Sequence, residues 1–262
     1  MDFASFKEMM RRHFHLDLNS YKETQLRRRL DAYLVRRQLP DYGALFQKLV
    51  GDPAAYRSFV DYLTINVSEF FRDPERFREL ESIILPGLLK EKRTLKIWSA
   101  GCAAGAEPYS VAIILEELTP GHLHHLEGTD IDQNILARAR EGRYPPEAVR
   151  NVSPQRLARF FTREGNFYVI DEKLRRRVNF RRQDLLNDSF GRGYDLILCR
   201  NVTIYFTREA QDRLNDKLAR ALAPGGVLFI GGSEMIFNYR ELDLEKIRTC
   251  FYRRRAAKGD NF

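Results

Sequence analysis

The sequence predicts an α/β protein with an all-helical N-terminal domain ahead of a parallel sheet. Three observations predict this fold class. Up to about residue 90, apolar residues recur at helical spacing. From Leu95 onward, short apolar strands alternate with helices, which is typical of a parallel sheet built from right-handed crossovers. The 262 residues suffice for one large domain or two small ones.

The composition excludes several classes of protein. Hydrophobic residues make up 44% and charged residues 31%, which is ordinary globular usage and excludes collagen-like, low-complexity and disordered chains. The longest aliphatic run, Val111 to Leu115, is far shorter than the roughly 18 to 20 residues of a membrane span. Charges interrupt the N-terminal stretch, so we expect no signal peptide, no membrane insertion and a cytoplasmic location.

Cysteine content and net charge narrow the chemistry further. Cys102, Cys199 and Cys250 are too few and too scattered for a disulfide framework or a zinc knuckle, so we expect reduced, buried thiols. The charge of +8 (44 basic minus 36 acidic residues) favours an anionic partner. A nucleic acid, an acidic protein surface and an anionic small molecule all fit that sign.

Helical spacing defines the first domain, residues 1–72, in which Leu26, Leu30, Tyr33 and Leu34 form one apolar face. Asp73-Pro74-Glu75 supplies an N-cap, a proline at the first helical position and an early acid. We therefore predict a linker helix over 73–90, running toward Pro86.

The second domain, residues 91–262, contains the alternating elements. We predict a small antiparallel β-subdomain at about 160–180, in which Phe167–Ile170 and Val178–Phe180 take part. The last helix is predicted to stop at Pro224-Gly225-Gly226. The predicted strands are 95–100, 126–130, 178–181, 195–199 and 227–230, and the predicted helices are 109–118, 135–141 and 208–222.

The first candidate binding motif is the turn Trp98 to Gly105 between a strand and a helix. Gly101 and Gly105, with small residues between them, let the backbone approach a ligand at a helix N-terminus. The position at the carboxyl edge of the sheet is typical of a nucleotide-binding turn. A tight turn without a ligand is the alternative.

The second candidate is Asp130, which ends the next predicted strand. A carboxylate at this spacing after a glycine turn binds ribose hydroxyls in dinucleotide folds. The alternative is an N-cap for the helix that starts near Gln133. A calcium loop is excluded, because Ile135 stands at the sixth position, where the sharp turn needs glycine.

Two further segments carry polar residues that a turn alone does not require. Residues 66–72 (NVSEFFR) precede the linker helix, with an amphipathic helix end as the alternative. Residues 199–206 (CRNVTIYF) leave a strand where open α/β sheets hold ligands, with a plain strand exit as the alternative.

The histidines of 122–125 lack partners at metal-ligand spacing, so we predict a surface loop and no metal site.

A basic segment lies in the first domain. Between Lys22 and Arg37 there are six basic and two acidic residues on a helix with an apolar stripe, which predicts a docking face for an acidic helix. The basic residues are Lys22, Arg27, Arg28, Arg29, Arg36 and Arg37.

With these motifs in order, the sequence resembles the chemotaxis receptor methyltransferases of the CheR family over nearly its whole length. The resemblance implies a Rossmann-like S-adenosylmethionine (SAM) domain, a helical receptor-docking domain and a small antiparallel β insert. It rests on Tyr21-Lys22-Glu23, Arg27 to Leu30, Asn66 to Arg72, Ile97 to Cys102, Glu107 to Ser110, Thr129 to Asp132, and Cys199 to Phe206.

The resemblance also implies the cofactor contacts. Two departures stand in the glycine loop, where the family pattern Ser-Thr-Gly-Glu-Glu is replaced by Ala103-Ala104-Gly105-Ala106-Glu107, so we expect weakened or altered SAM binding. The segment 165–170 is short, which argues against tethering by a receptor C-terminal peptide. The implied cofactor-binding residues are Asn66, Ser68, Arg72, Gly101, Glu107, Asp130, Asp184, Leu185, Asn201 and Val202.

The implied reaction moves a methyl group from SAM to a glutamate of a chemoreceptor's cytoplasmic helical bundle, leaving S-adenosylhomocysteine. A glutamate carboxylate is already ionised at pH 7, so no general base is needed. Arg72, Arg200 and Tyr205 are the candidate catalytic residues that orient the acceptor, with Asn201 linking Tyr205 to the cofactor. We expect a monomer recruited to membrane receptor arrays. The alternatives are a nucleic-acid methyltransferase and a non-catalytic SAM-binding adaptor.

Overall fold

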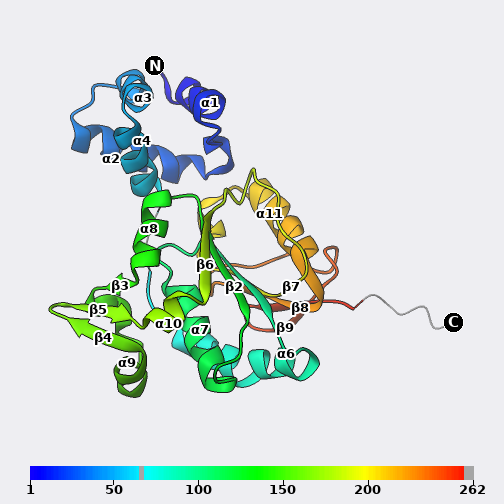
Figure 1. Ribbon diagram of the computed structural model, residues 1–262. Coiled ribbons are helices and arrows are strands. Elements are labelled where there is room, and N and C mark those ends of the chain that lie inside the picture. Colours follow the sequence, from blue (N-terminus) through cyan, green and yellow to red (C-terminus); the bar gives the residue numbers. More distant parts are fainter. Residues whose placement is uncertain (65–67, 257–262) are drawn as a thin grey trace.

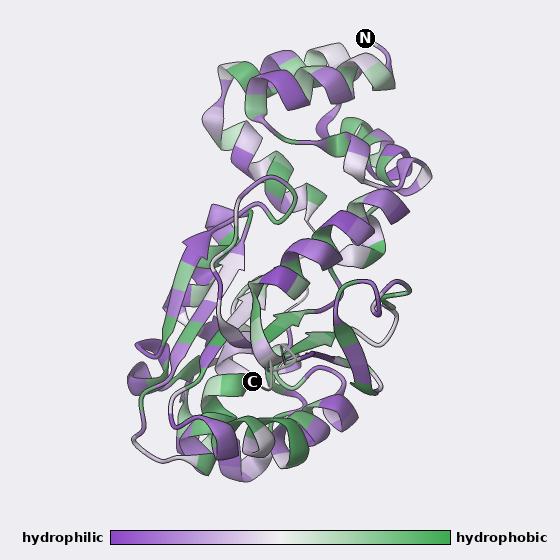
Figure 2. Cartoon of the chain, turned by 90° about the vertical axis from the view of Figure 1, so that its right-hand side faces the viewer, coloured by the Kyte–Doolittle hydropathy of each residue, from purple (hydrophilic) through white to green (hydrophobic). Residues whose placement is uncertain are grey.

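The protein folds into a helical domain that stands over one end of a sheet domain (Figure 1). The structure, a computed structural model, describes residues 1–64 and 68–256. The helical domain has its own apolar core, which begins at Phe3 and ends at Leu63, and Figure 2 shows hydrophobic and hydrophilic bands on the same helices. Its helices are α1 (Phe3–Phe14), η1 (Leu18–Ser20), α2 (Glu23–Arg37), α3 (Tyr42–Gly51) and α4 (Pro53–Leu63).

Helix α2 forms as its apolar spacing predicts. Leu26, Leu30 and Tyr33 are buried in the core of the helical domain, while the arginines between them point elsewhere. Gln38 ends the helix in a left-handed conformation and donates its N–H to carbonyls of the last turn. The basic helix is therefore fixed by one apolar stripe and leaves its remaining faces for other contacts.

The predicted linker helix is part of the core of the sheet domain. It consists of α5 (Pro74–Glu79), a π turn η2 (Leu80–Ile84) and α6 (Leu85–Glu91), so it continues through Pro86 instead of stopping there. Pro86 lies just after the π turn, an irregularity of the helix, and all residues from Leu80 to Leu85 that cap these segments stay in the right-handed helical region. Asp73 occupies the N-cap position, but its side chain makes no capping hydrogen bond, contrary to our prediction.

The main sheet has the strand order β6-β2-β1-β7-β8-β10-β9. Its first five strands are parallel, and β10 and β9 are added antiparallel at one edge. The predicted α/β fold class is thus confirmed, with helices α7, α8 and α11 packed on the sheet (Figure 1). The bounds are β1 (Lys96–Ala100), α7 (Ala106–Leu118), β2 (His125–Asp130), α8 (Gln133–Glu141), β6 (Val178–Arg182), β7 (Tyr194–Cys199), η4 (Thr203–Tyr205), α11 (Arg208–Ala221), β8 (Leu222–Ile230), β9 (Leu244–Arg248) and β10 (Phe251–Arg254).

A small antiparallel sheet is inserted between β2 and β6, as predicted, but its pairing differs. Phe167–Ile170 pairs with Phe161–Glu164 and with Arg143–Tyr144, whereas Val178–Arg182 joins the main sheet beside β2. The predicted pairing of 167–170 with 178–180 is therefore wrong. The elements of this subdomain are β3 (Arg143–Tyr144), η3 (Pro146–Val149), α9 (Pro154–Phe160), β4 (Phe161–Glu164), β5 (Phe167–Ile170) and α10 (Glu172–Arg175).

The end of α11 also differs from the prediction. The helix ends at Ala221, and Pro224-Gly225-Gly226 lies within β8. The register between β7 and β8 shifts at this point, and a Cβ on Gly226 would approach the carbonyl oxygen of Tyr194 to 2.6 Å. The glycines therefore serve an irregularity in the sheet rather than a helix stop.

The three cysteines are buried free thiols, as expected. No helix within the described ranges has the length and apolar character needed to cross a bilayer.

Candidate functional site

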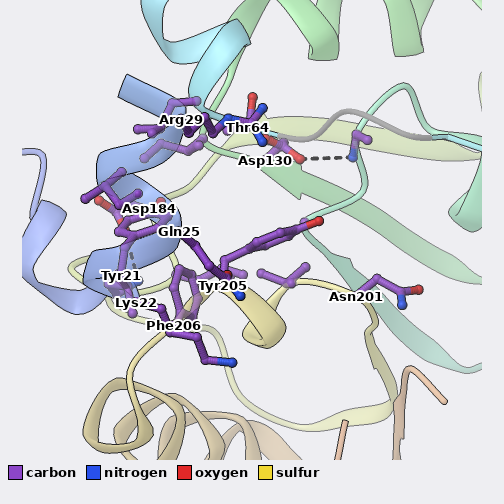
Figure 3. A pocket seen from close by; sticks show the side chains of 18 of the residues that line it. Tyr21, Lys22, Gln25, Arg29, Thr64, Asp130, Asp184, Asn201, Tyr205 and Phe206 are labelled. Atoms are coloured by element: carbon purple, nitrogen blue, oxygen red, sulfur yellow. Dashed lines mark hydrogen bonds between the residues drawn. The ribbon is translucent and has the colours of Figure 1, made fainter. Parts of the chain in front are cut away.

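A cavity of about 530 Å³ lies between helix α2 and the carboxyl ends of β1, β2 and β7 (Figure 3). This volume is within the range of small-molecule sites, and the place is where open α/β sheets bind ligands. The helical domain contributes Tyr21, Lys22, Gln25, Leu26, Arg28, Arg29, Ala32, Leu63 and Thr64 to the lining. The sheet domain and its linker contribute Arg72, Gly101, Ala103, Asp130, Ile131, Gln183, Asp184, Leu185, Leu186, Arg200, Asn201, Val202, Tyr205 and Phe206.

The glycine turn after β1 brings the backbone to the cavity. Gly101 has a φ of +76°, and a Cβ on it would stand 2.5 Å from Cγ2 of Val202. Its N–H and that of Cys102 donate to the carbonyl oxygen of Thr129 over 2.8 and 2.9 Å. Any larger residue at 101 is excluded by both conformation and space. The turn thus has the close backbone approach that a ligand-binding turn requires.

Asp130 ends β2 with its carboxylate in the cavity lining. Its two oxygens accept hydrogen bonds from the N–H groups of Ala103 (2.9 Å) and Asp132 (3.1 Å), and the residue is 8% exposed. Burial raises the pKa of Asp130 to about 6, although those N–H groups favour the ionised form. Each oxygen keeps a lone pair for a further donor. The carboxylate is therefore ionised at neutral pH and suited to a vicinal diol.

The N-cap alternative for Asp130 is excluded by the geometry around α8. Asp132 provides that cap, because its carboxylate accepts from the N–H groups of Asn134 (2.8 Å) and Ile135 (3.4 Å).

The loop after β7 carries Asn201, Val202 and Tyr205. Asn201 has a φ of +59°, and its buried Oδ1 has no hydrogen-bond partner within the part of the chain that is described. Figure 3 shows the ring of Tyr205 extending into the cavity, with its hydroxyl on the side of Asp130 and Asn201. Among the described residues, that hydroxyl also has no partner. The loop thus offers unsatisfied polar groups at a cavity, which is typical of a binding site.

Asp184 and Leu185 line another part of the cavity, on a loop that follows β6. The Asp184 carboxylate accepts from the N–H of Leu186 (2.9 Å) and the side-chain amide of Asn187 (2.8 Å). Its oxygens therefore mainly fix the turn, and buried Leu185 adds an apolar surface beside it.

Two predicted cofactor contacts, Ser68 and Glu107, are not among the described residues that line the cavity. Ser68 accepts a hydrogen bond from the N–H of Ala106 (3.2 Å) and so caps α7, whose N-cap residue is a glycine. Glu107 accepts from Oγ of Ser99 (2.7 Å), and burial raises its pKa. Asn66 lies outside the described residues.

Arg200 is a buried cation that joins the start of the linker to the first turn of α7. Its side chain is 2% exposed and pairs with Asp73 (2.5 Å) and Glu107 (3.3 Å). It also donates to the main-chain carbonyl of Arg72 over 2.9 Å. These bonds hold Arg72 at the cavity and leave Arg200 little freedom to bind an acceptor itself.

The six basic residues predicted to form one docking face point in several directions. Four are engaged within the protein: Lys22 donates to the carbonyl of Ile204, Arg29 to that of Tyr62 and Arg37 to Oγ of Ser58, while Arg27 stacks on Phe3. Arg28 and Arg36 have no ion pair or hydrogen bond with described residues. Of these two, Arg28 lines the cavity, as do Lys22 and Arg29, whose side chains are already engaged.

Sequence reasoning missed Glu234, which follows β8 by four residues. Its carboxylate accepts hydrogen bonds from the main-chain N–H groups of Asn201, Val202 and Thr203. A lone acid after Gly231-Gly232 is a weak signal, because acids are common in turns. Among the described residues there is no group of three or more His, Cys, Asp or Glu side chains that could hold a metal ion.

Two family descriptions match this chain. Residues 1–64 match "CheR methyltransferase, all-alpha domain", and residues 66–251 match "CheR methyltransferase, SAM binding domain". The chain belongs to the CheR methyltransferase family. A chemotaxis protein methyltransferase of Listeria monocytogenes is 40% identical over 96% of each chain. Chemotaxis protein methyltransferase 1 of Pseudomonas aeruginosa is 32% identical over 90% of this chain and 91% of its own.

SAM is accordingly the cofactor of this CheR-family chain, and the groups in the cavity fit it. Asp130 would take the ribose hydroxyls and the Gly101 turn would lie against the cofactor. Asn201 would add its buried Oδ1, which has no hydrogen-bond partner among the described residues. When bound, the cofactor supplies an electrophilic methyl group. Ala104 and Ala106, the two departures in the glycine loop, are not among the described lining residues, so the cavity itself gives no reason for weaker binding.

Proposed function

We propose that this protein transfers the methyl group of SAM to glutamate side chains of chemoreceptors, forming methyl esters. The proposal rests on the side chains that line the cavity. Arg72 and the hydroxyl of Tyr205 face the same space as Asp130, and Arg28 of the helical domain lies at its side. Cations and a free hydroxyl suit an acceptor that arrives as an anion.

The acceptor class follows from the absence of a base. Among the described residues that line the cavity there is no histidine, and the two acids, Asp130 and Asp184, are held by main-chain N–H groups. A hydroxyl or amine acceptor would require proton removal. A glutamate with a pKa of about 4.3 is ionised roughly 500 to 1 at pH 7 and needs none.

The chemistry then depends on positioning. Holding donor and acceptor in line can contribute as much as about 7 to 11 kcal/mol to catalysis. We propose that Tyr205 and Arg72 orient the acceptor carboxylate, and that Arg72 keeps it ionised as it leaves water. Arg200 takes a different role from the one expected from the sequence: it positions Arg72 through the linker.

The partner we propose is the acidic cytoplasmic helical bundle of a transmembrane chemoreceptor. The names of the Listeria and Pseudomonas relatives support a role in chemotaxis, and the charge of +8 suits an acidic surface. The protein would act as a monomer, reaching membrane receptor arrays from the cytoplasm. Arg28, which lies beside the cavity, would meet acidic residues near the methylated glutamate.

The test is incubation with methyl-labelled SAM and receptor-containing membranes. Label on a protein of receptor size that leaves as methanol in mild alkali supports a glutamyl ester. Label on nuclease-sensitive material would instead support nucleic-acid methylation. Bound cofactor without any transfer, across receptors from the same cell, would support a non-catalytic adaptor.

A further inference from the structure

The carboxylate of Glu234 holds the loop that carries the candidate site residues. Oε2 accepts hydrogen bonds from the N–H groups of Asn201 and Gly231, each over 2.8 Å. Oε1 accepts from the N–H groups of Val202 (3.0 Å) and Thr203 (2.8 Å) and from Oγ of Thr203 (2.7 Å). Five donors therefore converge on one side chain.

The donors converge because of the backbone conformation of the loop. Asn201 is left-handed, with a φ of +59°, and Val202 follows in the right-handed helical region. Successive residues of opposite hand direct their N–H groups into one concavity, which binds an anion. In this protein the anion is supplied by the chain itself, and asparagine is one of the few residues that adopt the left-handed conformation readily.

The space around this contact is tight. A Cβ on Gly231 would stand 2.7 Å from Oε2 of Glu234 and 2.9 Å from the main-chain nitrogen of Asn201. Glycine at 231 thus allows the end of β8 to approach the loop after β7, and Glu234 closes the remaining gap. Glu234 itself is not among the described residues that line the cavity.

We propose that Glu234 is a positioning residue for SAM binding. By filling the concavity of N–H groups it keeps Asn201 left-handed, and so it places Val202 against Gly101 and Tyr205 in the cavity. The inference deepens the proposed function, since it concerns the same site. It rests on the cofactor site alone and does not depend on which side chain accepts the methyl group.

The substitution that tests this role is Glu234→Gln. Each carboxylate oxygen of Glu234 accepts hydrogen bonds from two main-chain N–H groups. In the glutamine variant one of these oxygens is replaced by an NH₂ group, which cannot accept, so two N–H groups lose their acceptor in either orientation of the amide. Glu234→Asp keeps the charge but is one methylene shorter. Glu241→Gln is the matched control, because Glu241 is exposed and its side chain makes no hydrogen bond within the described ranges.

The readouts are the Kd of S-adenosylhomocysteine by calorimetry and amide hydrogen exchange of the protein without ligand. We expect Glu234→Gln to raise the Kd at least tenfold and to accelerate exchange at residues 201–203, with a smaller rise for Glu234→Asp and none for Glu241→Gln. A folded Glu234→Gln variant with an unchanged Kd overturns the proposal. This holds even if the melting temperature of the variant is lowered, because Glu234 would then stabilise the fold without positioning the cofactor site.

A milder variant covers the case in which Glu234→Gln does not fold. Thr203→Val removes one of the five donors and leaves the carboxylate in place. The Kd should then rise at least twofold, and an unchanged Kd contradicts the proposal. Neither assay contains a methyl acceptor, so failure of the proposed function would leave both results unaffected.

Discussion

The main-chain N–H of Lys22 donates to the carbonyl oxygen of Tyr205 over 2.9 Å, so the basic helix begins at the loop that carries the candidate catalytic hydroxyl. Tyr21 and Phe206 form an isolated antiparallel bridge beside this bond, and the N–H of Thr207 donates to the carbonyl of Ser20 over 2.8 Å. The helical domain is thus joined to the loop of Tyr205 by backbone hydrogen bonds. A partner that binds α2 therefore contacts an element fixed to Tyr205.

The buried carboxylate of Asp130 makes cofactor binding depend on pH. Its pKa is raised to about 6, so protonation below pH 6 removes the charge that would accept the ribose hydroxyls. We expect the affinity for S-adenosylhomocysteine to fall by up to about tenfold per pH unit below pH 6. Calorimetry between pH 5 and 8 measures this, and Asp130→Asn should bind weakly with a flat pH profile. A wild-type profile that is flat through pH 6 would contradict the assignment.

Lowering the pH weakens cofactor binding through Asp130, but through the same carboxyl group it stabilises the folded protein without ligand. The ordinary pKa of an aspartate is 3.8, and folding raises the pKa of Asp130 to about 6. Between about pH 4 and 6 the folded state therefore binds a proton that the unfolded state lacks. Its contribution to the free energy of unfolding therefore decreases as the pH rises through 6. Compared with wild type, Asp130→Asn should show a smaller loss of melting temperature between pH 5 and 7, measured without ligand.

Tyr205→Phe should lower kcat about ten- to a hundredfold and leave the Kd of S-adenosylhomocysteine unchanged. The reason is that a hydrogen bond to a charged acceptor contributes about 1.5 to 3 kcal/mol. The ring fills the same space in the variant, so the wall of the cavity is retained. Full methyl-transfer activity in Tyr205→Phe, with unchanged cofactor affinity, would show that the hydroxyl does not touch the acceptor.

Charge reversal in α2 separates two neighbouring arginines. Arg28 lines the cavity and has no ion pair or hydrogen bond with any residue that the structure describes, whereas the guanidinium of Arg27 lies 5.0 Å from the ring centre of Phe3. We expect Arg28→Glu to slow receptor methylation more than about tenfold at low salt, and Arg27→Glu to slow it less. Binding of S-adenosylhomocysteine serves as the control for both variants. Equal rates for the two variants would argue that the acceptor docks elsewhere.

Gly101→Ala should abolish tight cofactor binding. The left-handed backbone costs a non-glycine residue about 1 to 3 kcal/mol, and the added Cβ would overlap Val202. A rise in Kd of about tenfold or more is therefore expected. Gly232→Ala is the matched control, because nothing lies within 4 Å of a Cβ at that position. Similar affinities for the two variants would mean that the turn after β1 does not contact the cofactor.

Local sequence patterns predicted the scaffold of the site. The turn at Gly101 and the strand end at Asp130 were identified because each depends on a few neighbouring residues and on the rule that parallel strands end at one edge. The apolar stripe of α2 was identified for the same reason. These features require no knowledge of which distant segments meet.

Features that depend on distant partners were missed or misplaced. Glu234 binds residues more than thirty positions away, and no local pattern announces that contact. The sequence also did not announce that Glu107, which stays a predicted cofactor contact, accepts hydrogen bonds from Ser99 and Arg200. The strands β9 and β10 show no long apolar run, because β9 is the edge strand and residues of both strands are exposed. The run Arg27 to Arg29 is continuous in sequence, but successive residues of a helix are rotated by about 100°. The three arginines therefore point to different sides of α2.

The identity of the methyl acceptor can be tested by comparing two receptor fragments. A receptor fragment that contains the candidate glutamates and a matched fragment with those residues changed to glutamine would each be incubated with the enzyme and methyl-labelled SAM. We expect alkali-labile label on the glutamate fragment and none on the glutamine fragment. Equal labelling of both fragments, or label that withstands alkali, would contradict transfer to a glutamate carboxylate.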